Sequence, residues 1–445
     1  MTEPSQTPAT TDRAAALTVL VIGNGGREHA LTWAIAADPG VAAVHVAPGN
    51  PGTAAIATNH PVNATDPDAV AELATELGVD LVVVGPEAPL VAGVADAVRE
   101  AGIACFGPSA EAARLEGSKA FAKEVMAAAG VPTAQARVCT TADEAAAALD
   151  EFGAPYVVKD DGLAAGKGVV VTDDRRAALA HAEGCFSAGG TGSPSAVVIE
   201  EFLDGPEVSL FAISDGTTVR AFQPAQDFKR VGDDDHGPNT GGMGAYTPLD
   251  WAPDGLVDEV VATVIQPVVA ELTRRGTPFV GLVYAGLALT SRGVRVIEFN
   301  ARFGDPETQP LLALLRSPLG QVLHAAATGR LAETPPLEFA PGYAVGVVVA
   351  SEGYPAHPMK GQELPEREMA EHPEVLFFHA GTTRGGAGPL EVSGGRVLAA
   401  VATGPTLDHC GDTVYNALTR INFDDCFWRS DIAAKAARGE IKINN

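Results

Sequence analysis

Short apolar runs alternate with helical patterns over the first part of the chain. Runs such as Leu17–Ile22, Ala43–Ala47 and Leu81–Val84 each end in a turn, and a helical stretch follows. Strands that are apolar along their whole length are typical of a parallel sheet covered by helices on both faces. We therefore predict a doubly wound α/β domain over 17–117, with its ligands at the carboxyl ends of the strands.

The pattern changes in the middle of the chain, over 118–333. Strand-like segments follow one another there, with a lid subdomain expected at about 134–205. A helix near Leu256–Arg275 precedes two runs, Gly281–Leu289 and Val294–Asn300, which predict a β-hairpin. This order predicts an α+β domain. The Gly- and Asp-rich stretch Gly232–Gly244 is long enough to form a mobile loop.

The two ends of the chain differ from these domains. A Pro-rich linker over 334–342 leads to a last region, 341–445, whose apolar runs predict a small domain built on a mixed sheet. Residues 1–16 are polar and carry acids, and we expect them to form a disordered tail. The predicted fold class is thus α/β followed by α+β, in three domains.

Composition excludes several classes of partner. The 445 residues carry 56 acids against 30 bases, a net charge of −26, which argues against a nucleic-acid-binding face and against binding to anionic lipid. No apolar run approaches the ~18 residues of a membrane span, and the N-terminus lacks a secretory pattern, so we expect a cytoplasmic protein. The five cysteines are scattered and the histidines lack metal-site spacing, which predicts buried thiols and no zinc site.

The lysines are few, and their positions are informative. Only eight occur, with none before residue 119, and four of them lie in or beside Gly-rich turns. Cations gathered at such turns in so acidic a protein predict a site for polyanionic ligands such as phosphates. These four are Lys119, Lys159, Lys167 and Lys229.

Two Gly-rich turns are candidates for anion binding. The turn Gly23–His29 follows a strand and opens a helix, but Glu28 stands where a dinucleotide fingerprint has its third glycine. A phosphate or phosphosugar is therefore favoured over a nicotinamide cofactor, and a purely structural turn stays open. The stretch Asp161–Val169 lacks the spacing of a P-loop and lies between strands, which predicts a hairpin over phosphates, with Lys159 reaching a phosphate oxygen.

A third segment carries candidate metal ligands. In the strand Val296–Asn300, Glu298 and Asn300 lie on one face, and their oxygens suit Mg²⁺ when phosphates supply further ligands. The following segment, Ala301–Gln309, is dense in charged and turn residues. An arginine there, Arg302, suits the charge that develops on a phosphoryl or acyl-phosphate group.

These segments together resemble a known family, the phosphoribosylamine–glycine ligases of the ATP-grasp superfamily. The resemblance rests above all on Asn300–Glu307, with support from Gly23–His29, Gly162–Val169, Gly237–Tyr246 and Arg429–Ile432. It implies a central ATP-grasp domain and the ATP-dependent ligation of glycine to 5-phospho-D-ribosylamine through glycyl phosphate. This is the second step of purine biosynthesis, and it needs no enzyme nucleophile. The family also implies small-molecule substrates and transient contact with neighbouring enzymes of the pathway.

The resemblance carries site roles onto single residues. The catalytic positions it implies are Arg302, Lys159 and Asp227. The ATP-binding positions it implies are Lys119, Lys159, Gly166, Lys167, Gly168, Glu200, Glu201, Phe202, Leu203, Glu207, Lys229 and Asn239. The positions it implies for the other substrates are Gly25, Gly26, Arg27, Asn50, Glu87 and Asp305. It assigns the metal, Mg²⁺ or Mn²⁺, to Glu298 and Asn300.

Three residues depart from the commonest family pattern, and rival functions stay open. Asp160 replaces a small residue beside Lys159, Phe228 replaces a frequent histidine, and Pro206 replaces an acid before Glu207. The main rival is another ATP-grasp carboxylate–amine ligase with a different acceptor. A nicotinamide oxidoreductase and a catalytically silent nucleotide-binding protein are the others.

Overall fold

The computed structural model describes residues 16–162, 168–188, 196–421 and 423–443. The tail expected over 1–16 lies outside these ranges, except for Ala16. Within the described residues, none of the helices combines the length and the apolar composition that a membrane crossing requires.

The N-terminal domain is a parallel sheet of five strands in the order β3-β2-β1-β4-β5. Four-residue β4 is buried along its whole length, which is why its sequence is continuously apolar. The strands are β1 (Leu17–Gly23), β2 (Val41–Pro48), β3 (Thr58–Asn59), β4 (Leu81–Val84) and β5 (Ala104–Phe106). The helices are α1 (Gly26–Ala36), α2 (Pro51–Ala54), α3 (Pro67–Leu77), α4 (Glu87–Val91) and α5 (Val94–Glu100). This confirms the doubly wound prediction.

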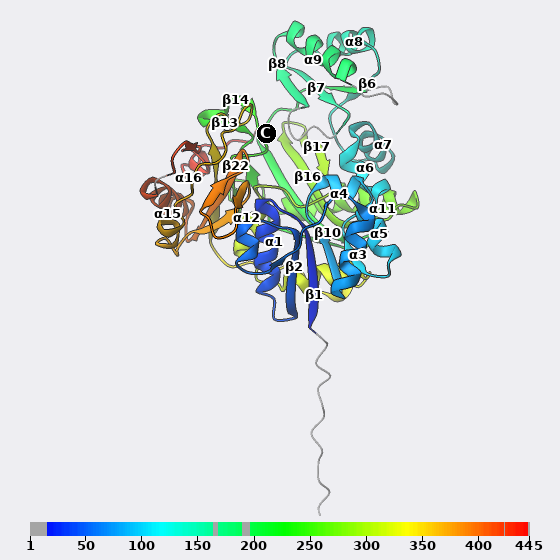
Figure 1. Ribbon diagram of the computed structural model, residues 1–445. Coiled ribbons are helices and arrows are strands. Elements are labelled where there is room, and N and C mark those ends of the chain that lie inside the picture. Colours follow the sequence, from blue (N-terminus) through cyan, green and yellow to red (C-terminus); the bar gives the residue numbers. More distant parts are fainter. Residues whose placement is uncertain (1–15, 163–167, 189–195, 422, 444–445) are drawn as a thin grey trace, which may run out of the picture.

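A second part of the chain forms a separate lobe, which we call the outer lobe (Figure 1). Its antiparallel sheet has the order β6-β9-β7-β8, and its apolar core is its own. Helices α6 (Ala110–Gly117) and α7 (Lys119–Ala129) lead into it. Its elements are β6 (Ala136–Cys139), α8 (Ala142–Phe152), β7 (Tyr156–Asp160), β8 (Val169–Thr172), α9 (Arg175–Ala188) and β9 (Val197–Glu200).

The central sheet runs β11-β10-β16-β17 and is antiparallel. The predicted hairpin is confirmed as β16 and β17, and its register shifts so that Ile297 has no partner. The strands are β10 (Glu207–Asp215), β11 (Val219–Ala221), β16 (Val280–Thr290) and β17 (Gly293–Asn300). The helices are α10 (Leu256–Val260), the π-helix η2 (Val261–Ile265), α11 (Gln266–Arg274), α12 (Thr308–Leu314), α13 (Leu319–Ala327) and the 3₁₀ helix η3 (Leu331–Glu333).

The last sheet takes strands from two distant parts of the chain. Its order is β12-β15-β18-β22-β19, with β23 paired to β18, and every pairing is antiparallel although we expected a mixed sheet. Its strands are β12 (Gln226–Asp227), β15 (Gly244–Thr247), β18 (Tyr343–Ser351), β19 (Leu376–His379), β22 (Arg396–Gly404) and β23 (Cys426–Phe427). A small hairpin of β20 (Thr382–Arg384) and β21 (Leu390–Val392) and three helices, α14 (Glu366–Ala370), α15 (Leu407–Arg420) and α16 (Ala434–Ala437), complete this part.

The stretch expected to be a mobile loop is a β-hairpin. Strands β13 (Arg230–Gly232) and β14 (His236–Asn239) pair antiparallel around the 3₁₀ helix η1 (Asp233–Asp235). The side chains that hold it, Arg429 and Asp431, come from the far C-terminal part of the chain. No local sequence pattern could therefore have revealed that this stretch has a regular structure.

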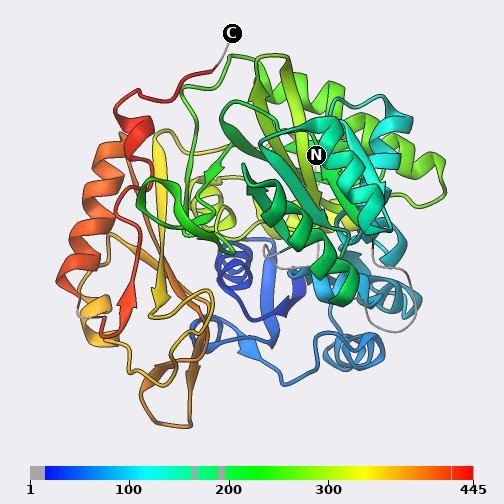
Figure 2. The ribbon, with the colours of Figure 1, turned by 90° about the horizontal axis from the view of Figure 1, so that it is seen from above.

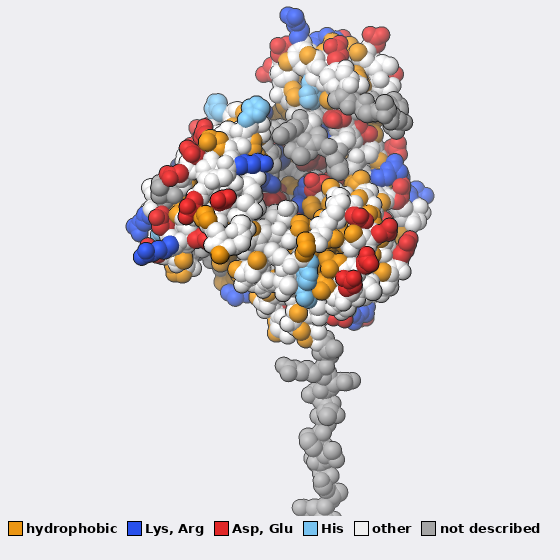
Figure 3. Space-filling view, in the orientation of Figure 1, with side chains coloured by type: hydrophobic (Ala, Val, Ile, Leu, Met, Phe, Trp, Pro, Cys, Tyr) orange, Lys and Arg blue, Asp and Glu red, His pale blue; other side chains and the backbone are white. Residues whose placement is uncertain are grey.

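Viewed from above, the C-terminal sheet with α15 lies on one side of the molecule and the central elements on the other (Figure 2). The N-terminal domain contacts both, because α1 packs against β19 and against α12. The space-filling view shows an indentation between the outer lobe and the rest of the molecule, with Lys and Arg side chains at its rim (Figure 3).

Candidate functional site

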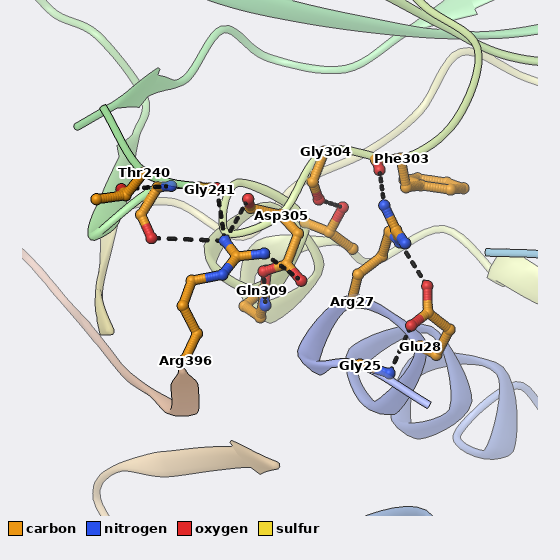
Figure 4. A network of polar contacts seen from close by, with 12 residues as sticks. Gly25, Arg27, Glu28, Thr240, Gly241, Phe303, Gly304, Asp305, Gln309 and Arg396 are labelled. Atoms are coloured by element: carbon orange, nitrogen blue, oxygen red, sulfur yellow. Dashed lines mark hydrogen bonds and ion pairs between the residues drawn. The ribbon is translucent and has the colours of Figure 1, made fainter. Parts of the chain in front are cut away.

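The turn after β1 holds an acid in the space that a dinucleotide would need. Glu28 is 1% exposed, accepts a hydrogen bond from the Gly25 amide at 2.7 Å and pairs with Arg27 Nε at 2.5 Å (Figure 4). A Cβ added to Gly23 would lie 2.5 Å from Glu28 Cγ, and one added to Gly85 would lie 2.3 Å from Glu28 Oε1. The acid therefore fills the gap between the ends of β1 and β4, which argues against a nicotinamide cofactor there.

The side chain of Asn50 forms hydrogen bonds to other residues of the protein through both its oxygen and its nitrogen. Its Oδ1 caps α2 by accepting from the Gly52 and Thr53 amides at 2.9 and 3.0 Å. Its Nδ2 donates to the carbonyls of Asn24 and His379, both at 2.9 Å. Asn50 thus joins the turns after β1 and β2 to β19, and it shapes the site by fixing these turns.

Arg302 lies between two carboxylates where the N-terminal domain meets the central sheet. Its Nη2 lies 2.9 Å from Glu116 Oε1, and its Nε lies 3.3 Å from Glu87 Oε2. Arg27 Nη1 lies 4.0 Å from the same Glu87 oxygen and donates to the Phe303 carbonyl at 3.1 Å. Burial alone would raise the pKa of Glu87, but Arg302 and Arg27 hold it below its usual value. The result is a row of alternating charges across the junction.

Glu200 holds one lysine on each of its oxygens. Lys159 Nζ lies 2.8 Å from Oε2 and Lys123 Nζ lies 2.9 Å from Oε1, while Lys159 and Glu200 are each only 4% exposed. Lys159 also donates to the Ile297 carbonyl at 3.0 Å. Burial would lower the pKa of Lys159, but Glu200 and Glu298 hold it above its usual value. The two ammonium groups share the Glu200 carboxylate, so each is held in place at a position where it can also interact with a phosphate.

Lys229 lies where the β13–β14 hairpin meets the central sheet. Its Nζ lies 2.6 Å from Glu207 Oε2 and 3.0 Å from Asp227 Oδ1. Burial alone would lower its pKa, but these two carboxylates hold it well above its usual value. The amide and hydroxyl of Thr240 donate to the Lys229 carbonyl at 2.8 and 2.9 Å, and Asn239 ends β14 beside them.

Glu298 and Asn300 have the donor set expected of a metal site. They lie two residues apart at the end of β17, opposite Gly286 and Tyr284 of β16. In the described part of the chain, neither side chain forms a hydrogen bond or an ion pair with another residue, and no three His, Cys, Asp or Glu residues gather as metal ligands. Two free oxygen donors fit Mg²⁺ or Mn²⁺ if phosphate oxygens and water complete the shell.

A cavity of about 350 Å³ lies where the turns of the N-terminal domain meet the C-terminal sheet. Asp305 borders it, accepting from Gln309 Nε2 at 2.9 Å and lying 3.4 Å from Arg396 Nη2 (Figure 4). Arg396 Nη1 donates to the carbonyls of Gly241 and Asp305 at 2.6 and 2.8 Å. The residues that line the cavity are Asn24, Gly25, Gly49, Asn50, Asp305, Ala380, Gly381, Thr382, Ser393, Gly394 and Arg396.

The remaining predicted positions are placed as follows. Gly26 opens α1 and Lys119 opens α7, from which Lys119 Nζ donates to the Gly162 carbonyl at 3.2 Å. Gly168 accepts from the Asp160 amide at 2.8 Å, whereas Gly166 and Lys167 lie outside the described residues.

Three of the predicted ATP-binding residues, Glu201, Phe202 and Leu203, directly follow β9. Glu201 Oε2 lies 3.0 Å from Arg292 Nη2, and Glu201 Oε1 accepts from the Gln135 amide at 3.1 Å. Phe202 is 46% exposed, and Leu203 is half-buried. Both side chains are therefore accessible beside the outer lobe.

The structure gathers the predicted residues into two groups. In the first group, Glu207 and Glu298 lie close enough to Lys159 and Lys229 to raise the pKa values of both lysines, and the two lysines lower the pKa of Glu207. The second group, at the N-terminal domain, comprises Gly25, Arg27, Asn50, Glu87, Arg302 and Asp305.

Four functional candidates were missed from the sequence: Lys123, Glu116, Glu307 and Arg396. Lys123 lies one turn after Lys119 in α7, so helical spacing offered a signal. Glu307 is buried and accepts from Tyr284 Oη at 2.6 Å. For Glu116, Glu307 and Arg396, the partners lie far away in the sequence, and no local pattern marks them.

Three models of one family match consecutive parts of the chain. The phosphoribosylglycinamide synthetase N domain matches 17–116, the ATP-grasp (A) domain matches 117–308 and the C domain matches 344–435. The phosphoribosylamine–glycine ligase of Streptomyces coelicolor is 62% identical over 422 residues, covering 94% of this chain and 99% of the relative. That of Mycobacterium tuberculosis is 55% identical over 430 residues, covering 96% and 100%.

Solved structures agree with this assignment. The phosphoribosylamine–glycine ligase of Thermotoga maritima superposes with a TM-score of 0.80 at 34% identity, covering 94% of this chain and 100% of its own. The biotin carboxylase domain of Hydrogenobacter thermophilus 2-oxoglutarate carboxylase, solved with MgADP, gives 0.71 at 17% identity, covering 92% and 91%, and shows the fold alone. The chain, with its parallel N-terminal sheet, its central ATP-grasp elements and its antiparallel C-terminal sheet, belongs to the phosphoribosylglycinamide synthetase family, the phosphoribosylamine–glycine ligases.

Proposed function

We propose that this chain ligates glycine to 5-phospho-D-ribosylamine, with cleavage of ATP to ADP and phosphate, to form glycinamide ribonucleotide in purine biosynthesis. The observation that carries the proposal is 62% identity to a phosphoribosylamine–glycine ligase across 94% of the chain. The geometry supports it, because the buried Lys159, the oxygen donors of Glu298 and Asn300, and a cavity at the N-terminal turns lie in one molecule. A cytoplasmic location and transient contact with pathway enzymes belong to the same proposal.

The reaction has two displacements, and neither needs an enzyme nucleophile. A glycine carboxylate oxygen attacks the γ-phosphorus of ATP, the bond to the β,γ-bridging oxygen breaks, and ADP leaves. The amine of phosphoribosylamine then attacks the carbonyl carbon of glycyl phosphate, loses a proton, and inorganic phosphate leaves. Both steps require positioning and neutralisation of phosphate charge. These are the properties that the clusters at Glu200 and Lys229 supply.

We assign the nucleotide to the space between the outer lobe and the central sheet. Lys159, Lys119 and Lys229 bind its phosphates, with Asn239 beside Lys229. Glu298 and Asn300 hold the divalent ion, Mg²⁺ or Mn²⁺, which when bound would neutralise phosphate charge and align the γ-phosphoryl group. The residues assigned to cover the phosphates are Gly166, Lys167 and Gly168, and those assigned to adenine and ribose are Glu200, Glu201, Phe202, Leu203 and Glu207.

We assign phosphoribosylamine to the cavity at the N-terminal turns. Gly25, Gly26 and Asn50 shape it, and Arg27 and Glu87 lie at its border with the central domain. Arg302 faces the junction from the other side, where its guanidinium stabilises the transferring phosphoryl group. We assign to Asp227 and Asp305 one of two roles: they bind the amine of glycine, or they keep the adjacent loops ordered.

The test is ADP release with ATP, Mg²⁺, glycine and freshly generated phosphoribosylamine, beside reactions that lack one component each. We expect release only when both glycine and phosphoribosylamine are present, with equal amounts of glycinamide ribonucleotide formed. Release that does not depend on glycine would point to a ligase with another acceptor. Absence of release in every mixture would overturn the proposal and favour a silent nucleotide-binding protein.

A further inference from the structure

The segment Arg429–Asp431 holds the β13–β14 hairpin. The Arg429 side chain is fully buried, and its guanidinium forms a two-pronged pair with Asp431, with Nε–Oδ1 and Nη2–Oδ2 both at 2.7 Å. Its Nη1 lies 2.7 Å from Asp235 Oδ1 and donates to the Arg230 carbonyl at 3.2 Å. One guanidinium therefore joins the C-terminal segment to the first residue of β13 and to the last residue of η1.

The tip of the hairpin depends on this segment. Asp234 and Asp235 have φ values of +53° and +59°, in the left-handed region that side chains disfavour. The Asp234 amide donates to Asp431 Oδ2 at 2.9 Å, and the Ser430 amide donates to Asp233 Oδ1 at 2.8 Å. Three consecutive acids repel one another, so this conformation needs the partners that the C-terminal segment supplies.

Arg429 also touches the base of the hairpin. Its Cζ lies 4.8 Å from the centre of the Phe228 ring, and the Phe228 amide donates to the Gly244 carbonyl at 3.0 Å. Phe228 directly precedes Lys229, whose ammonium lies between Glu207 and Asp227. The guanidinium therefore packs against the residue next to Lys229, as well as holding the hairpin that follows Lys229.

We propose that Arg429 is a positioning residue for nucleotide binding, acting through the β13–β14 hairpin on Lys229. This inference rests on the proposed function, in which Lys229 binds ATP phosphate. A buried guanidinium with three charged or carbonyl partners is costly to separate from them, so the hairpin is held in one place before ATP arrives. The hairpin is thus a fixed wall of the site, and not a loop that orders over the nucleotide.

The test uses two variants on opposite sides of the contact and one matched control. Arg429→Lys keeps the charge but loses the planar fork, and Asp235→Asn removes the hairpin's charged partner while leaving the Arg429–Asp431 pair intact. The control is Arg438→Lys, which alters the exposed Arg438–Glu440 pair near the same end of the chain. Steady-state constants for each substrate, MgATP binding by calorimetry, and hydrogen exchange are measured on all proteins.

We expect Arg429→Lys and Asp235→Asn to raise KM and Kd for MgATP by about tenfold, with KM for phosphoribosylamine unchanged. Faster exchange should be confined to residues 230–240, and Arg438→Lys should match the wild type. An unchanged Kd for MgATP in a folded Asp235→Asn protein would overturn the inference. So would weaker binding of every substrate with faster exchange throughout, because that pattern indicates general loss of stability. Failure of wild-type turnover would count against the proposed function alone, since MgATP binding and exchange test the hairpin without it.

Discussion

Buried and half-buried carboxylates hold the cations of this site in ion pairs. Glu200 binds Lys123 and Lys159 on separate oxygens, and Arg302 is held between Glu116 and Glu87. Removing one member of such a cluster leaves the others in a changed electrostatic field. Substitutions at these positions should therefore act on ligand binding as well as on the residue replaced.

The metal assignment predicts a specific effect at Glu298. Glu298→Gln keeps the side chain's shape and one oxygen but removes the charge that attracts a divalent cation. We expect the Mg²⁺ concentration for half-maximal ADP release to rise by about tenfold or more. A Mg²⁺ titration at fixed ATP measures this, with the exposed Glu259→Gln as control. An unchanged Mg²⁺ requirement would remove Glu298 from the metal site.

Lys123 provides a second test at the same scale. Lys123→Met removes one of the two cations that share Glu200, so the positive charge beside Lys159 is reduced. We expect the Kd for ATP to rise by about tenfold, with a smaller change in thermal stability. Calorimetric titration of MgATP measures the effect, and Lys360→Met, at an exposed position, is the matched control. Equal affinities in the two variants would mean that Lys123 has no part in the site.

At the scale of elements, the sequence predicted well where a pattern is continuous. The apolar runs of β1 and β4 and the alternation in β17 each lie within one segment, and the structure confirms these strands. The hairpin over Arg230–Asn239 was missed, and a loop was expected over Gly232–Gly244, because Asp233 accepts a hydrogen bond from a residue 197 positions further along the chain. The partners of Arg396 are also distant in the sequence. The contacts of Glu28 depend on the shape of the turn after β1, which residue types alone do not reveal.

The contact between α1 and β19 predicts a pH effect. His29 Nδ1 accepts from the His379 amide at 2.8 Å, and burial lowers the pKa of His29 to about 3 and that of His379 to about 4. Below about pH 6.5 the unfolded chain binds protons that the folded protein does not, so stability falls as the pH drops from there toward 3.

His29→Asn keeps an acceptor near the Nδ1 position and removes the titrating ring. We expect the stability of this variant to depend less on pH between pH 7 and 4 than that of the wild type. Urea unfolding at several pH values measures the free energy of unfolding of both proteins. The carboxylates contribute equally to both, so their contribution cancels when the two curves are subtracted. Parallel curves would show that the His29 ring does not couple to folding.

At the scale of the whole molecule, the division into three domains is not a division into independent parts. Strands β12 and β15 belong to the middle of the chain but pair within the C-terminal sheet, where β15 lies directly beside β18. A fragment of residues 1–333 would therefore expose the edge of β15, and exposed strand edges promote association.

We expect this fragment to elute as aggregates in size-exclusion chromatography and to regain a monomeric form when it is produced together with residues 334–445. The full chain is the control for the elution volume. A monodisperse fragment with a cooperative unfolding transition would show that the central part folds without β18.

The same strand arrangement sets an order of events during synthesis. After β15 leaves the ribosome, residues 248–342 must be made before its partner β18 appears, which takes roughly 5 to 20 s at bacterial rates of translation. Throughout that time the nascent chain carries the β13–β14 hairpin without the segment Arg429–Asp431 that holds it. Because Arg429–Asp431 follows β18 in the sequence, the hairpin gains the contacts that hold it even later than β15 gains its partner strand.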